Sequence, residues 1–230
     1  MGKASQQAVA EFIATFTLIF IGAGSSILYA AHQVDLVGVA LAHGLALAIM
    51  VSVTAHVSGG HVNPAVTAGL WVTGKIQTTR AGLYVVAQLL GAAVGALALR
   101  GTFPTALWKP ANLGTPLPAS SITAGTAVLL EAILTFFLVF VVFGTAVDES
   151  GPFAKLAGFP IGLVLTMDIL AAGTLTGAAM NPARSFGPAL VSGTWTDWWV
   201  YWVGPVSGGI IAAAVYWFTF LRDREPVLPD

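Results

Sequence analysis

Six long apolar segments restrict this chain to a membrane fold more strongly than any other feature of its sequence. They are expected at 8–30, 36–57, 81–99, 124–147, 157–176 and 198–220. A helix of about 20 apolar residues crosses the roughly 30 Å hydrocarbon core of a bilayer. Only 8% of the residues are charged, whereas a soluble domain carries about 25%. The sequence therefore predicts an all-α membrane protein with six transmembrane helices.

Two further apolar segments, at about 64–73 and 182–191, are too short to cross, and each follows an Asn-Pro-Ala triplet. The triplets are Asn63, Pro64 and Ala65, and Asn181, Pro182 and Ala183. Asn is a strong N-cap and Pro suits the first helical position, so each triplet predicts a helix start. Irregular backbone at membrane depth has to be buried in protein or line a wet cavity. We therefore expect two re-entrant half-helices that meet at a constriction.

The two halves of the chain repeat. The matched positions are Glu11 with Glu131, Gly44 with Gly162, Asn63 with Asn181, and Gly91 with Gly209. Each half has three spans, an odd number, so the second copy must be inverted, and inverted repeats place the functional site near the midplane. We expect one channel-like domain over 1–230. Its repeats cover about 1–100 and 123–222, and the outer connection 101–122, which has four prolines, joins them.

Positive charges are distributed unevenly over the connections of this topology. One side carries Lys3, Lys75, Arg80, Lys155, Arg222 and Arg224. The other side carries Arg100 and Lys109. Because cytoplasmic connections are enriched in Lys and Arg, we expect both chain termini in the cytoplasm and 101–122 on the outer side.

Two carboxylates, Glu11 and Glu131, lie at matching positions inside predicted spans. Ionisable residues at this depth usually face the protein interior. One interpretation is a proton or cation site. The other is that each carboxylate accepts hydrogen bonds from the free backbone N–H groups of a re-entrant segment. The equal placement in both repeats favours this structural role. Asp168, in the fifth span, is a third such carboxylate, and the sequence assigns it no role.

Arg184 follows Asn181 by one helical turn and is the best candidate for a selectivity charge at the constriction. The four histidines include no pair at helical ligand spacing, and the chain has no cysteine. We therefore expect no metal centre and no cofactor. A net charge of −1 gives no basis for binding nucleic acid. No nucleotide-binding motif or catalytic triad spacing is present, so we do not expect an enzyme.

The segments 58–67 and 180–189 resemble the two signature motifs of the aquaporin (major intrinsic protein) family. The resemblance extends over essentially the whole chain, including 10–12 and 199–205. It implies a homotetramer in membrane lipid with one pore in each subunit. It also implies a narrow selectivity filter formed by four residues, which by motif position are His43, Ile169, Ala178 and Arg184.

This filter is similar to that of plant tonoplast intrinsic proteins, which pass water and often urea, ammonia or hydrogen peroxide. Glycerol channels typically carry Asp after the Arg, where this chain has Ser185. The tonoplast group often has a His in the outer loop, and 101–122 has none. We therefore expect the cell membrane as the location, with the vacuolar membrane as the alternative.

The resemblance implies a passive water channel that excludes protons and ions. In this mechanism both Asn side chains donate to passing water, Arg184 repels cations, and backbone carbonyls accept from water. The expected carbonyls belong to two extended runs, with Gly59, Gly60, His61 and Val62 in the first and Gly177, Ala179 and Met180 in the second. The alternative is a channel that also passes small neutral solutes such as urea, ammonia or hydrogen peroxide, with glycerol less favoured. A coupled transporter is a distant alternative.

Overall fold

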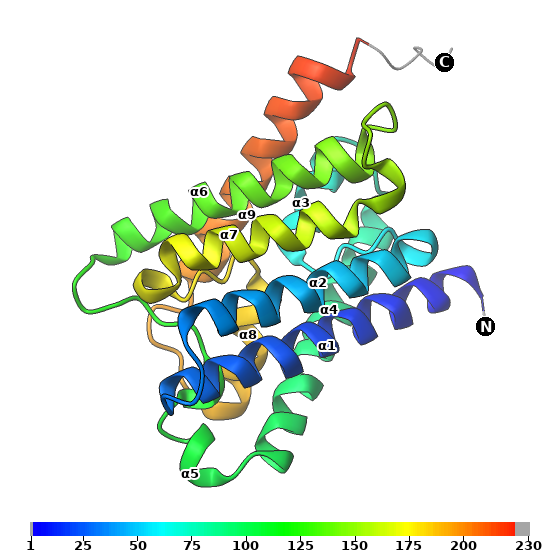
Figure 1. The fold of residues 1–230 in the computed structure, drawn as a ribbon. Coiled ribbons are helices and arrows are strands. Elements are labelled where there is room, and N and C mark those ends of the chain that lie inside the picture. The colour runs from blue at the N-terminus through cyan, green and yellow to red at the C-terminus, as the bar shows by residue number, and fades with distance from the viewer. Residues whose placement is uncertain (1, 224–230) are drawn as a thin grey trace.

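The computed structural model describes residues 2–223, and all six expected spans are long helices (Figure 1). They are α1 (Lys3–Ala30), α2 (Leu36–Ser58), α4 (Thr78–Thr102), α6 (Ala124–Val142), α7 (Gly158–Thr176) and α9 (Val200–Tyr216). Wider π-helical turns, Phe143–Val147 and Trp217–Leu221, extend α6 and α9. Within residues 2–223 the secondary structure is entirely helical. The prediction of an all-α membrane protein is confirmed.

The two short segments are also helices. They are α3 (Pro64–Val72) and α8 (Pro182–Ser192), and each begins directly after its Asn, as the N-cap argument predicts. The outer connection 101–122 is more ordered than its prolines suggest. It contains α5 (Thr105–Trp108) and a 3₁₀ turn (Asn112–Gly114), and Leu113 and Gly114 are buried. This connection therefore packs into the helix bundle, where its 3₁₀ turn contacts α1 and α8.

The long helices pack side by side in an order different from their order in the chain. Along this series α4 contacts α1, α1 contacts α2, α2 contacts α7, α7 contacts α6, and α6 contacts α9. The half-helices lie inside, where α3 packs mainly on α9 and α8 packs mainly on α4. Each half-helix thus packs on the third long helix of the other repeat, so the two halves interlock.

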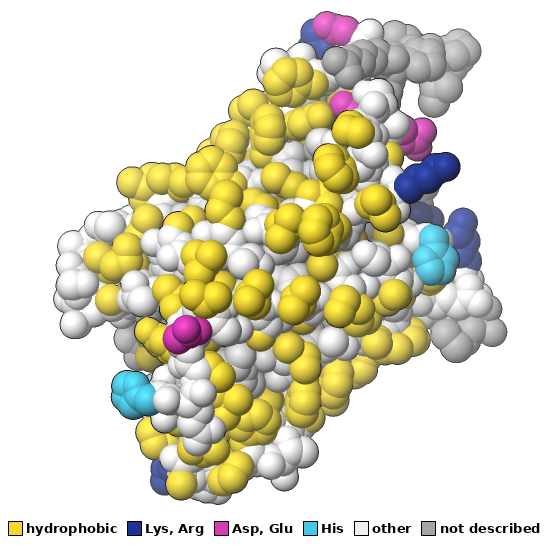
Figure 2. All heavy atoms as spheres, viewed as in Figure 1, with side chains coloured by type: hydrophobic (Ala, Val, Ile, Leu, Met, Phe, Trp, Pro, Cys, Tyr) yellow, Lys and Arg dark blue, Asp and Glu magenta, His cyan; other side chains and the backbone are white. Residues whose placement is uncertain are grey.

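The flank of the molecule is apolar, and charged side chains lie towards its ends (Figure 2). Large apolar residues such as Leu45, Ile49 and Leu90 are more than half exposed on α2 and α4. Such a surface suits contact with lipid tails. Lys3, at the start of α1, and Arg222, after α9, lie at the same end as Arg80 at the start of α4 and as the connections that carry Lys75 and Lys155. Arg224 lies outside the described residues.

Glycines allow the closest approach between long helices. A Cβ atom on Gly162 of α7 would meet the carbonyl oxygen of Gly44 on α2, and one on Gly44 would lie 2.6 Å from the carbonyl oxygen of Gly162. Small residues at a crossing let two helix backbones touch. The match of Gly44 with Gly162 therefore places two equivalent glycines opposite each other at the seam between the repeats.

The expected match of Gly91 with Gly209 is wrong by one residue. Gly91 on α4 packs against the backbone of Phe12, which follows Glu11. The glycine that packs against the equivalent backbone, at Ala132, is Gly208. The sequence alone could not fix this register, because positions 208 and 209 are both glycine. The contact of Gly208 with Ala132 fixes it.

Candidate pore

Each half-helix is preceded by a loop that alternates into the left-handed backbone region. Positive φ angles occur at Gly59, Gly60 and Val62 in the first loop, and at Gly177, Ala178 and Met180 in the second. The two sets match position for position. The loops are therefore not the extended runs expected from the sequence. Their left-handed residues turn successive N–H groups towards one side of the loop. Each left-handed residue with a side chain costs roughly 1–2 kcal/mol, so other contacts must hold these loops.

The buried carboxylate of Glu11 on α1 provides those contacts for the first loop. It accepts hydrogen bonds from the backbone N–H groups of His61 and Val62 at 2.9 and 2.7 Å. Ser58 Oγ and Gln88 Nε2 donate to it at 2.7 and 2.8 Å. A carboxylate only accepts, and four donors replace the water that it loses on burial. Its position is that of a loop anchor.

Glu131 on α6 does the same for the second loop. Its carboxylate accepts from the backbone N–H groups of Ala179 and Met180 at 3.0 and 2.7 Å, and from Thr176 Oγ1 at 2.7 Å. Among the described residues no fourth donor takes the place that Gln88 has beside Glu11. Both repeats therefore keep the carboxylate that binds the loop N–H groups, but only the first repeat adds a side-chain amide donor to it.

The two Asn side chains join the loops across the repeat. Asn63 Oδ1 accepts from the N–H of Ala65 at 2.8 Å, and Asn63 Nδ2 donates to the carbonyl of Met180 at 2.8 Å. Asn181 caps α8 in the same way and donates through Nδ2 to the carbonyl of Val62 at 3.0 Å. One N–H of each amide is thus used within the protein. Its second N–H has no acceptor among residues 2–223, and both side chains line a cavity.

Arg184, near the start of α8, is held from three directions. Its Nε donates to His43 Nε2 at 3.2 Å, Nη1 donates to the carbonyl of Gly114 at 2.7 Å, and Nη2 donates to Ser26 Oγ at 3.2 Å. His43 Nδ1 lies 2.9 Å from the carbonyl of Val39. That contact places the proton on Nδ1, which leaves Nε2 as the acceptor that Arg184 needs. The other two of the five guanidinium N–H groups have no acceptor among residues 2–223.

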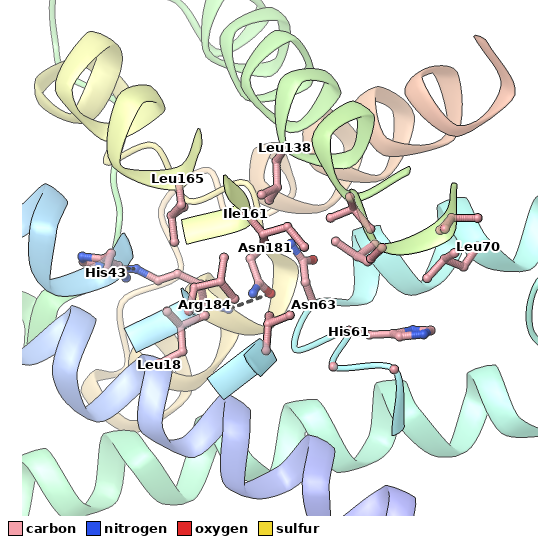
Figure 3. A pocket seen from close by; sticks show the side chains of 18 of the residues that line it. Leu18, His43, His61, Asn63, Leu70, Leu138, Ile161, Leu165, Asn181 and Arg184 are labelled. Atoms are coloured by element: carbon pink, nitrogen blue, oxygen red, sulfur yellow. Dashed lines mark hydrogen bonds between the residues drawn. The ribbon is translucent and has the colours of Figure 1, made fainter. Parts of the chain in front are cut away.

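Two hollows meet at Arg184. The inner one has a volume of about 240 Å³ and is lined by His43, Asn63 and Asn181 together with apolar side chains (Figure 3). The outer one has a volume of about 230 Å³ and is lined by Ser26, Gly114 and Ile169 among others. Of the described residues, Arg184 is the only one that lines both. The guanidinium therefore stands at the passage between two spaces that can each hold several water molecules.

Of the other residues predicted to form the filter or to supply carbonyls, some line one of the hollows and the rest are buried in the core. Ile169 lines the outer hollow, whereas Ala178 is buried and lines neither hollow. Gly59, Gly60, His61 and Ala179 line the inner hollow, and Gly177 lines the outer one. Val62 and Met180 are buried, and their carbonyls accept from the Asn of the opposite loop. These two carbonyls therefore tie the loops together, which the expected ladder did not include.

Several residues of this site had no signal in the sequence. Gln88 joins Glu11 to Thr67 Oγ1, which in turn contacts His61 Nδ1. Ser26 and Gly114 hold Arg184 from α1 and the outer connection. Each is an ordinary residue type that acquires its role only through a distant partner. Asp168 is buried, and its Oδ2 has no hydrogen-bond partner among the described residues.

Comparison with known proteins gives one consistent result. The family model described as Major intrinsic protein matches residues 2–216. Aquaporin TIP1-2 of Zea mays is 46% identical, covering 96% of this chain and 88% of that protein. Aquaporin TIP1-1 of Arabidopsis thaliana is 42% identical, covering 98% and 91%. The X-ray structure of the aquaglyceroporin from Plasmodium falciparum is similar with a TM-score of 0.84 at 28% identity, covering 93% of this chain and 95% of that one.

Proposed function

This chain belongs to the major intrinsic protein family and is a water channel, and we propose that water crosses it passively between the two hollows, past Arg184, Asn63 and Asn181. The observation that carries the proposal is that Arg184 alone, among the described residues, lines both hollows. Its guanidinium offers two unused N–H groups to a molecule that passes. Membership of a channel family supports a pore protein over an enzyme or a coupled transporter.

The second part of the proposed pore is the pair of Asn amides. Each donates one N–H to the opposite loop, so the amide is fixed and its second N–H can donate to a passing water. The N-termini of α3 and α8 lie beside these amides and add a positive potential. A water molecule exchanges its hydrogen bonds for those of the amides at little cost, whereas a cation meets repulsion there.

The third part is the charge of Arg184. Two unit charges about 4 Å apart repel by about 4 kcal/mol at an effective dielectric constant near 20. Since 1.4 kcal/mol corresponds to a factor of ten, this repulsion alone slows a cation by a factor on the order of 10³. The contacts with His43 and Gly114 keep the charge at the passage, because the guanidinium cannot swing away.

Small neutral solutes are the second candidate cargo. Ile169 borders the outer hollow with an apolar surface, so the passage beside Arg184 has fewer polar groups than one with a second His there. That composition supports the passage of urea, ammonia or hydrogen peroxide besides water. Glycerol is less favoured, because the position after Arg184 is Ser185.

The surroundings of the channel are also proposals. We propose a homotetramer in membrane lipid with one pore in each subunit, since residues such as Leu45 and Ile49 leave an apolar flank available. Both termini face the cytoplasm. The relatives named TIP are tonoplast intrinsic proteins. They support a location in the vacuolar membrane, and they do not support the cell membrane, which was the first expectation.

Purified protein in lipid vesicles tests this function. Vesicles that contain the wild-type chain should shrink much faster than empty vesicles in a sucrose gradient, with no increase in proton leak. Arg184→Val should raise proton leak and admit larger neutral solutes, whereas Arg184→Lys keeps the charge and serves as the matched control for proton exclusion. Tetramer content is measured first. Shrinkage no faster than that of empty vesicles would refute the water channel, and an Arg184→Val protein with wild-type leak would remove Arg184 from proton exclusion.

A further inference from the structure

Helix α1 approaches the narrow passage through two residues one turn apart, Gly22 and Ser26. Gly22 gives room to His43, because a Cβ atom there would lie 2.5 Å from His43 Cδ2 and 2.6 Å from Nε2. Ser26 Oγ accepts from Arg184 Nη2 at 3.2 Å and borders the outer hollow. His43 and Arg184, the two polar filter residues, therefore rest against the same face of α1. None of the four filter positions lies on this helix.

The hydroxyl of Ser26 is prepared for this contact. It donates its own proton to the carbonyl of Gly22 at 3.2 Å, so its lone pairs face away from the helix and can accept from Arg184. The neighbouring Ser25 also donates to the carbonyl of Gly22, at 2.7 Å, but it forms no hydrogen bond with Arg184. The two serines thus differ in the one interaction that concerns the pore.

We propose that Ser26 is a further specificity-determining residue of the channel, which accepts an Nη2 N–H of Arg184 and so keeps that donor from binding neutral solutes that carry a strong acceptor. This inference rests on the proposed function. His43 and Gly114 accept from Nε and Nη1 and so fix the planar guanidinium, and Ser26 is the acceptor that satisfies the remaining nitrogen. Without Ser26, one Nη2 N–H beside the outer hollow has no acceptor.

A freed N–H affects solutes unequally. It binds an acceptor such as the carbonyl oxygen of urea more tightly, while conduction requires that a solute leave as readily as it enters. Urea and formamide are larger than water and present a strong carbonyl acceptor. Loss of the Ser26 hydroxyl should therefore lower their permeability relative to that of water.

The test compares variants of the full chain in lipid vesicles. Permeabilities to water, formamide and urea are measured for Ser26→Ala, with Ser25→Ala as the matched control and Ser26→Thr as the variant that restores the acceptor. We expect the urea-to-water ratio of Ser26→Ala to fall by up to about tenfold, the factor that one net hydrogen bond represents. The two comparison variants should match wild type. If wild type conducts water alone, the readout is water permeability per tetramer, which should fall only in Ser26→Ala.

Each outcome decides the point. Ser26→Ala with wild-type permeabilities overturns the role of Ser26 and leaves the water channel intact, and so does an equal change in Ser25→Ala. Wild-type vesicles that do not conduct water overturn the proposed function itself. If Ser26→Ala forms no tetramer, Ser26→Cys replaces it, because a thiol has similar size and is only a weak acceptor.

Discussion

Replacement of Glu131 by Gln separates a loop anchor from a proton-handling group. The amide NH₂ of Gln must face either Met180 N–H, or Thr176 Oγ1 together with Ala179 N–H. The hydroxyl of Thr176 can turn and accept, but a backbone N–H cannot. Either way one buried N–H loses its acceptor. A hydrogen bond to a charged group contributes about 1.5–3 kcal/mol and a stranded donor costs about 1–3 kcal/mol, so the expected loss is about 3–6 kcal/mol.

Glu11→Gln should cost a similar amount, although Glu11 has a fourth donor. The side-chain oxygen of Gln88 is buried without a partner, so the Gln88 amide can turn over and accept from the new NH₂. The Val62 N–H has no such choice. The matched control is Glu149→Gln, at an exposed carboxylate on the connection between α6 and α7.

Thermal unfolding of the purified tetramer, followed by tryptophan fluorescence, measures these losses. For a chain of this size, roughly 2–4 °C per kcal/mol predicts a Tm lower by about 6–24 °C for either anchor variant. A Tm within about 2 °C of the Glu149→Gln control would show that the N–H contacts do not hold the loops. A stable Glu131→Gln protein with altered proton transport would support the coupled transporter instead.

Three further perturbations test the rest of the site and fold. Ile169→His places a polar ring at the outer hollow, so urea or peroxide flux should fall while water flux persists. Unchanged solute flux would show that Ile169 does not line the passage. Gly162→Val drives a side chain into the carbonyl of Gly44, and folded tetramer recovered from the membrane should fall sharply, whereas normal recovery would mean that α2 and α7 can separate without cost. Single cysteines at Lys3 and Asn112 should label from the cytoplasmic and outer sides respectively, and external labelling at Lys3 would reverse the topology.

The local features of the fold could be predicted because their causes are local. Hydrophobic length gives a span, and Asn63-Pro64 gives a helix start, whatever the rest of the chain does. Helix ends were less certain: α1 begins at Lys3 and not at residue 8, because polar residues at the edge of a bilayer can continue a helix that hydropathy alone ends. The equal placement of Glu11 and Glu131 pointed to their partners, since the repeat itself relates the two sites.

The contacts around Arg184 could not be predicted in this way. Gly114 lies 70 residues from Arg184 in the sequence, and Ser26 lies 158 residues away. A glycine carbonyl and a serine hydroxyl carry no pattern that marks them as acceptors for a buried cation. Only the packing order of the helices, which departs from their order in the chain, brings them together.

The cross-loop hydrogen bonds of Asn63 and Asn181 join residues that the ribosome adds at very different times. Asn63 and Met180 are 117 residues apart. Synthesis at roughly 5–20 residues per second therefore adds Met180 about 6–23 s after Asn63. During that interval the first loop is anchored by Glu11 but lacks its partner across the midplane. The bonds across the midplane therefore form only after most of the chain has been made, and a nascent chain halted before residue 180 lacks one partner of each cross-loop bond.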